Sequence, residues 1–214
     1  GFTDDIVLPI LGAAYPWNYR NKMALPVAQA TGGPILGYYR QGSHQVVPID
    51  GCLIQKEENN RVLRFVEGFM TRHHVRGYNE KSGKGTIRHI MARVGDKGEV
   101  MVVIVTATEV LPFHDLWVEE MRKLLPEVVS IYHDVQSGRG NAILGPVIHP
   151  LCGKKTLTAS LCGLSFEVSP FSFFQVHKEQ AEVLYDRALT YANLSGSETV
   201  IDAYCGTGTI SLCL

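Results

Sequence analysis

The sequence lacks the features expected of a membrane protein or of a protein from an oxidising compartment. It contains no run of about 18 apolar residues, and its first residues carry Asp4 and Asp5 where a leader would be basic and then apolar. The five cysteines are odd in number and widely spaced, without a C-x-x-C pair, which favours reduced thiols. We therefore expect a soluble, cytoplasmic monomer with no membrane partner.

An excess of positive charge is also missing. The chain has 20 Lys and Arg residues against 21 Asp and Glu residues, giving a formal net charge of −1. Composition therefore predicts no global attraction to nucleic acid, and any RNA contact must be local. With 214 residues and 45% hydrophobic content, the chain can bury the core of one large domain or of one and a half ordinary domains.

Residues 15–170 carry signals for paired strands and two helices. Thr31-Gly32-Gly33-Pro34 predicts a hairpin turn, Pro26 an edge position or strand end, and the turn at 95–98 an antiparallel pair. The expected helices are 53–73 and 116–125. The expected strands are 23–27, 35–40, 45–49, 86–94, 99–108 and 128–135, and 156–161 and 164–168 complete the strand signals. This pattern predicts a central α+β domain, preceded by a linker, 1–14, from a missing N-terminal region.

Residues 171–214 have a different pattern. A helix at 177–193 is followed by a strand at 199–203, a glycine loop and an apolar helix that begins at Ile210. Strand, loop and helix succeed one another in the order that builds a parallel α/β sheet, but the sequence stops before a second strand. We interpret 171–214 as the truncated N-terminal part of a Rossmann-like domain.

The glycine loop predicts a nucleotide-like or nucleoside-like ligand. Asp202 closes the expected strand, and Gly206 and Gly208 allow a ligand to approach the backbone before a helix N-terminus that favours anionic groups. Ser211 stands where a dinucleotide fingerprint needs a third glycine, which disfavours an NAD-dependent oxidoreductase. Taken alone, the loop is also compatible with a purely structural turn.

A second motif lies upstream of the loop, at Ser169-Pro170-Phe171-Ser172-Phe173-Phe174-Gln175-Val176-His177. Together with Asp202-Ala203-Tyr204-Cys205-Gly206-Thr207-Gly208, it resembles the RNA uridine-C5 methyltransferase family, although His177 replaces the usual asparagine. The resemblance implies a class I methyltransferase that uses S-adenosyl-L-methionine. It further implies that Gln175 contacts this cofactor, that Tyr204, Thr209 and Asp202 line its site, and that Gly206 and Gly208 form the floor. The alternatives are local roles, with Gln175 satisfying backbone groups and Tyr204 half-buried at a strand end.

The resemblance extends to 17–22, 37–44, 52–55 and 85–90, and is closest to the bacterial 23S ribosomal RNA branch, with the transfer RNA branch as a near relative. Basic and aromatic side chains in these segments can pair with phosphates and stack on unpaired bases. The candidate RNA-binding residues are Tyr19, Arg20, Lys22, Arg40, Arg88 and His89. The alternative for each is a solvated side chain on a strand face.

Cysteine chemistry is implied only for a longer parent protein. In iron–sulfur members of the family, a cysteine at the position of Cys52 joins three others, which this sequence lacks, so a [4Fe-4S] cluster is predicted only for the parent. The resemblance also places the cysteine nucleophile and the carboxylate base beyond Leu214. Since Cys205 lies within the glycine loop and Cys213 in an apolar helix, the 214 residues alone are predicted to be inactive, or to act as a non-catalytic RNA-binding module.

Overall fold

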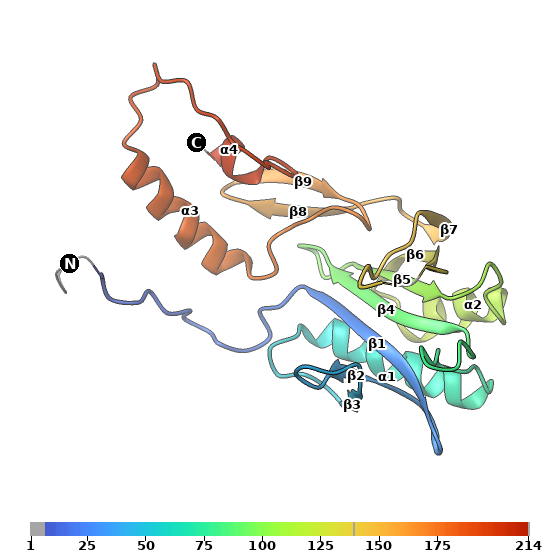
Figure 1. The fold of residues 1–214 in the computed structure, drawn as a ribbon. Coiled ribbons are helices and arrows are strands. Elements are labelled where there is room, and N and C mark those ends of the chain that lie inside the picture. Colours follow the sequence, from blue (N-terminus) through green and yellow to red (C-terminus); the bar gives the residue numbers. More distant parts are fainter. Residues whose placement is uncertain (1–6, 139, 214) are drawn as a thin grey trace.

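The computed structural model describes residues 7–138 and 140–213. Its largest feature is a seven-stranded sheet in the order β3-β2-β1-β4-β5-β6-β7, with α1 and α2 on one face and a smaller unit on the other (Figure 1). The strands are β1 (Lys22–Ala30), β2 (Gly33–Tyr39), β3 (Val46–Pro48), β4 (Ile87–Val94), β5 (Val100–Thr106), β6 (Val128–Val135) and β7 (Val147–Gly153), and the helices are α1 (Glu57–Arg72) and α2 (His114–Leu124). Within these residues, no helix has both the length and the apolar character needed to cross a membrane.

The core lies between the sheet and its two helices. Apolar side chains spaced along α1 are fully buried against β1, β4 and β5, and Phe69 of α1 packs on Trp117 of α2 with ring centroids 3.7 Å apart. The predicted helix 53–73 is confirmed as α1, but it begins at Glu57. Residues 53–55 lie before the helix and bond to the segment ahead of β1. The backbone N–H of Arg20 donates to the Ile54 carbonyl (2.8 Å), and Arg20 forms a bridge with Gln55.

The pairing of β1 corrects the prediction of an edge strand. Its first half, Lys22 to Pro26, pairs with β4, and its second half, Val27 to Ala30, pairs with β2. Pro26 therefore lies where the strand changes partners, and its missing N–H is tolerated inside the sheet. The predicted hairpin of β1 with β2 and the antiparallel pair of β4 with β5 are confirmed.

Strand β7, which pairs with β6 at the sheet edge, was not predicted from the sequence. Its strand signal is weakened by Pro146, just before the segment, and by Pro150 within it. An edge strand accepts proline because one of its two sides has no neighbouring strand to bond. The strand does not alternate cleanly between buried and exposed positions. The segment therefore offers neither a proline-free stretch of β-favouring residues nor a clean alternation of apolar and polar residues.

The smaller unit contains β8 (Leu157–Leu161), β9 (Leu164–Val168), α3 (Lys178–Ala192) and α4 (Thr209–Cys213). The predicted strands 156–161 and 164–168 are confirmed as β8 and β9, but they form a separate two-stranded sheet that packs with α3 and are not part of the large sheet. Residues 199–203 form no strand, so the prediction of a strand there is wrong. A strand needs a hydrogen-bonding neighbour, and Ile201 is 88% exposed. The predicted helix 177–193 is confirmed as α3.

Candidate functional site

The glycine loop between Asp202 and α4 adopts the backbone angles that its glycines permit. The φ angles of Gly206 and Gly208 are 58° and 72°, in the left-handed region that glycine adopts at little cost. A Cβ added to Gly206 would meet no described atom within 4 Å. The loop therefore leaves open space above its backbone, although it follows an irregular segment and not the expected strand.

A chain of hydroxyl and amide groups joins this loop to the Phe-Gln-Val segment. The side-chain amide of Gln175 donates to the Tyr185 hydroxyl (3.3 Å), and that hydroxyl lies 2.9 Å from the hydroxyl of Thr209. The Thr207 hydroxyl also donates to the carbonyl of Phe173 (3.1 Å). The structure thus brings together two motifs that are separated by the whole of α3.

Gln175 and Thr209 are part of this junction, whereas the side chains of Tyr204 and Asp202 are arranged differently. Tyr204 is fully exposed, with a φ of 67°, and is not the half-buried aromatic of the local alternative. Asp202 accepts a hydrogen bond from the hydroxyl of Ser211, the residue that replaces the third glycine of the dinucleotide fingerprint. The sequence gives no signal for this role of Tyr185, because a tyrosine at helical spacing among apolar residues is typical of a packed helix face.

His177 caps α3 in place of the asparagine that the family usually has. Its Nδ1 accepts from the backbone N–H of Gln180 (3.5 Å), and its ring stacks on Tyr19 with centroids 4.0 Å apart. Asn21 extends the junction, because its side-chain amide donates to the Gln175 carbonyl (3.0 Å). The Gln175 segment is therefore attached to the start of β1 as well as to the glycine loop.

The six candidate RNA-binding residues fall into two separate groups. Tyr19, Arg20 and Lys22 lie at the junction between the large sheet and the smaller unit. Burial lowers the pKa of the Lys22 amine, and the nearby positive charges of Arg93 and Arg20 lower it further. Tyr19 is used in packing against His177, so its ring is not a free stacking platform.

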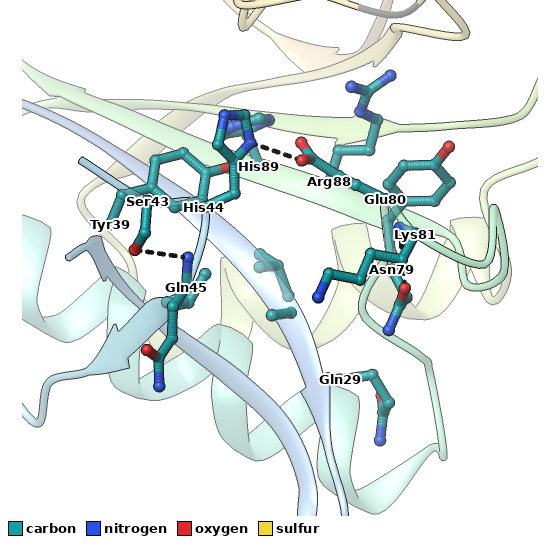
Figure 2. A pocket seen from close by; sticks show the side chains of 14 residues that line it. Gln29, Tyr39, Ser43, His44, Gln45, Asn79, Glu80, Lys81, Arg88 and His89 are labelled. Carbon is teal, nitrogen blue, oxygen red and sulfur yellow. Dashed lines mark hydrogen bonds and ion pairs between the residues drawn. The ribbon is translucent and has the colours of Figure 1, made fainter. Parts of the chain in front are cut away.

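Arg88 and His89 line a hollow of about 490 Å³ on the sheet face opposite α1 and α2 (Figure 2), and Arg40 follows Tyr39, which also lines it. Arg88 donates to the carbonyls of Gln136 (2.6 Å) and Gly138 (2.7 Å), and its guanidinium lies over the Tyr78 ring. Arg88 is thus a buried structural cation, contrary to the expectation of a phosphate ligand on the surface. Arg40 is exposed on the turn that follows β2.

Two residues at this hollow were not singled out from the sequence. His44 Nδ1 lies 2.6 Å from a carboxylate oxygen of Glu80, and this contact joins the turn after β2 to the loop before β4. The two residues are 36 positions apart, so no local pattern indicates their contact. His89 is beside them and is only 8% exposed, and its burial together with the Arg88 charge lowers its pKa to about 4.

The cysteines form no described metal site. Among residues 7–138 and 140–213, no three Cys, His, Asp or Glu side chains gather in a way that could hold a metal ion. Cys52 is half-buried, and its backbone N–H donates to the Asn60 side chain (2.9 Å). Burial and the neighbouring Cys162 raise the pKa of the Cys213 thiol to about 12, which disfavours a thiolate nucleophile there.

Comparison with known proteins gives relatives that are named as RNA methyltransferases. A protein from Halalkalibacterium halodurans named as an uncharacterized RNA methyltransferase is 46% identical over 209 residues, which cover 97% of this chain and 46% of that protein. Proteins with the same description from Lactiplantibacillus plantarum and Clostridium tetani are 46% and 39% identical over 98% and 100% of this chain. The chain spans slightly under half the length of these relatives, at 46–47%. No protein-family model matches the chain.

A solved structure with the same fold comes from Pyrococcus abyssi. It is a tRNA (uracil-54, C5)-methyltransferase in complex with S-adenosyl-L-homocysteine, and the match has a TM-score of 0.73 at 23% identity. The match covers 94% of this chain and 47% of that one. The architecture described above therefore occurs within a known methyltransferase structure.

Proposed function

We propose that this chain is part of an RNA methyltransferase that transfers a methyl group from S-adenosyl-L-methionine to carbon 5 of a uridine. The observation that carries the proposal is the hydrogen-bonded junction of Gln175, Tyr185 and Thr209, which holds the Phe-Gln-Val segment against the glycine loop. The names of the curated relatives and the S-adenosyl-L-homocysteine bound by the structural neighbour support the same reaction and cofactor.

In this proposal, the open space over Gly206 receives the cofactor. Positive φ angles turn the loop toward α4, and a backbone without Cβ atoms allows a nucleoside to approach closely. Gln175 can present its amide oxygen while its nitrogen is held by Tyr185. The bound cofactor would supply an electrophilic methyl group, and Gln175 and the glycine loop would bind and orient the cofactor.

We propose 23S ribosomal RNA as the substrate, with transfer RNA as the second candidate. The sequence resemblance favours the ribosomal branch, whereas the structural neighbour acts on transfer RNA. The two substrates can be separated by incubating the longer protein that contains this chain with S-adenosyl-L-methionine carrying a labelled methyl group. We expect 5-methyluridine in 23S ribosomal RNA fragments, and incorporation into transfer RNA alone would reverse the assignment.

The cofactor site is tested by calorimetry with S-adenosyl-L-homocysteine, using NAD as the competing ligand class. Gln175→Ala should weaken binding about fivefold, as expected for one lost hydrogen bond of about 1 kcal/mol. Gln41→Ala, at an exposed position in the turn after β2, is the matched control and should leave the affinity unchanged. Equal affinities of the wild type and Gln175→Ala, or tighter binding of NAD, would contradict the proposed site.

We further propose that the 214 residues alone do not transfer methyl groups. The protonated Cys213 thiol is a poor nucleophile, and Cys205 is exposed within the cofactor loop, where the methyl donor would bind. The parent's nucleophile and its carboxylate base would come from other parts of the longer protein, as would the three further cysteines of any [4Fe-4S] cluster that includes Cys52. Methylation of a uridine-containing RNA by the purified chain would overturn this proposal.

A further inference from the structure

The sheet face opposite α1 and α2 has a continuous recess near the β2 end of the sheet. Two adjoining hollows of about 490 and 350 Å³ share Tyr39, Ser43, His44, Glu80 and His89. Both volumes lie within the range of about 300–1,000 Å³ that is usual for small-ligand sites. The recess is formed by β1 and β4 together with the turn after β2 and the loop before β4, as Figure 2 shows.

A buried polar atom in this recess has no partner among the described residues. His89 is only 8% exposed and lines both hollows, and its Nδ1 atom is buried without a hydrogen bond. A buried nitrogen in this state loses its bond to water and gains nothing in exchange, which is rare in folded proteins. A ligand in the recess that presents a hydrogen-bonding edge would compensate for that loss.

The charges around His89 favour an uncharged ligand over a phosphate. Glu80 places a carboxylate at the recess, 2.6 Å from His44. His89 remains neutral at physiological pH because burial and Arg88 hold its pKa near 4. The Arg88 guanidinium already donates to two carbonyls and lies over Tyr78. The remaining cation at the recess, Lys81, is exposed to solvent, where its charge is screened. A phosphate would therefore meet the Glu80 carboxylate and a neutral ring with little compensation.

Aromatic surface is available at the same place. Tyr39 is 39% exposed, and its ring lies 5.3 Å from that of His44. Flat, uncharged heterocycles bind by stacking on such rings and by hydrogen bonds along their edges, which is how unpaired RNA bases are recognised. We propose that the recess is a subsite for one unpaired base of an RNA strand, with Tyr39 stacking on the base and His89 Nδ1 bonding to its edge.

The position of the recess fits the proposed function, on which the choice of RNA as ligand rests. His89 and Arg93 lie on the same face of β4, four residues apart, which corresponds to about 13 Å along a strand. Arg93 donates to the Ser172 carbonyl (2.7 Å), three residues before Gln175. β4 therefore connects the recess directly to the segment that carries Gln175, and an RNA strand that leaves a base in the recess would continue over the segments that cover Met91, which is 2% exposed.

The test measures binding of the 214-residue chain to a short, fluorescent single-stranded RNA and to the same RNA with its bases removed. The wild type should prefer the intact RNA. Tyr39→Ala should weaken binding of intact RNA by roughly 5- to 100-fold, the effect of one lost stacked base, and should leave binding of abasic RNA unchanged. Tyr39→Phe should retain the affinity, because the ring is preserved.

Tyr191→Ala is the matched control, since Tyr191 is an exposed tyrosine on α3 that is 68% accessible and remote from the recess. Three results would each overturn the base subsite. The first is equal binding of intact and abasic RNA, and the second is heparin competing as effectively as the unlabelled intact RNA. The third is an equal effect of Tyr39→Ala and Tyr191→Ala. S-adenosyl-L-homocysteine affinity, measured on the same variants, distinguishes the two proposals. The affinity for S-adenosyl-L-homocysteine should not change in Tyr39→Ala. A wild type without a preference for intact RNA would therefore contradict the base subsite and leave the proposed cofactor site standing.

Discussion

The large sheet and the smaller C-terminal unit differ in how completely their apolar side chains are covered. Every residue of β4 and β5 is buried, because helices or other chain segments lie on both faces of these strands. In the smaller unit, Ile201, Tyr191 and Leu184 are 88%, 68% and 62% exposed. A sequence can thus be apolar in both regions, yet only the region whose strands are covered on both faces by other described segments forms a closed core.

This difference has consequences for stability. The large sheet is expected to open only with the whole fold, whereas the smaller unit has few buried contacts and should open locally at a lower free energy. The residues that hold the proposed cofactor loop belong to the less stable region, and the proposed base subsite belongs to the more stable one. Substitutions in the two regions should therefore differ in their effects on the free energy of unfolding.

The largest effect is expected for Trp117→Ala in the core of the large sheet unit. Trp117 is fully buried and packs on Phe69, so its removal leaves a cavity and should cost about 3–5 kcal/mol of unfolding free energy. Urea unfolding followed by circular dichroism measures this loss. Tyr191→Ala on α3 is the control and should change stability by less than about 0.5 kcal/mol. Similar losses in both variants would show that the two regions are equally well covered.

The second effect is a pH dependence that originates in the large sheet unit. The pKa of His89 is about 4 in the folded chain against 6.5 for the unfolded residue. Between these values the unfolded state binds a proton that the folded state does not, so stability falls as pH is lowered from about 6.5 toward 4. The full difference corresponds to about 3 kcal/mol.

Unfolding titrations at successive pH values check this prediction. His89→Asn should reduce the slope between pH about 6.5 and 4.5, with a remainder from His133, whose pKa is also lowered by burial. The same substitution at exposed His74, where asparagine tolerates the φ of 54°, should preserve the wild-type slope. An unchanged slope in His89→Asn would contradict the assigned burial of this residue.

The same contrast explains which parts of the fold could be predicted from the sequence. Helices α1, α2 and α3 and the pair of β4 with β5 follow from local periodicity and turn residues, and these predictions are confirmed. The strand expected at 199–203 has suitable side chains but pairs with no other described segment, so its sequence pattern alone predicted it wrongly. The interior position of Pro26 depends on a change of partner along β1, which no local rule contains.

The candidate sites show the same limit. The glycine loop and Gln175 were found because each belongs to a motif that is continuous in sequence. The recess depends on His44, Glu80 and His89, which come from three separate segments, and only the fold brings them together. Arg88 shows the opposite error, because a basic residue in an aromatic context suggests a phosphate ligand, whereas the structure uses its guanidinium to bind the carbonyls of Gln136 and Gly138.

The smallest effect is expected in the less covered region, for Tyr185→Phe. This change removes the hydroxyl that accepts from Gln175 and lies 2.9 Å from Thr209, while it keeps the buried ring. Loss of this link should lower the unfolding free energy by only about 1 kcal/mol, but it frees the Gln175 side chain and should weaken S-adenosyl-L-homocysteine binding about fivefold. Calorimetry measures the second quantity, with Tyr191→Phe on the same helix as control. If both variants bind equally well, the hydroxyl link does not position Gln175, and the cofactor loop is organised by its glycines alone.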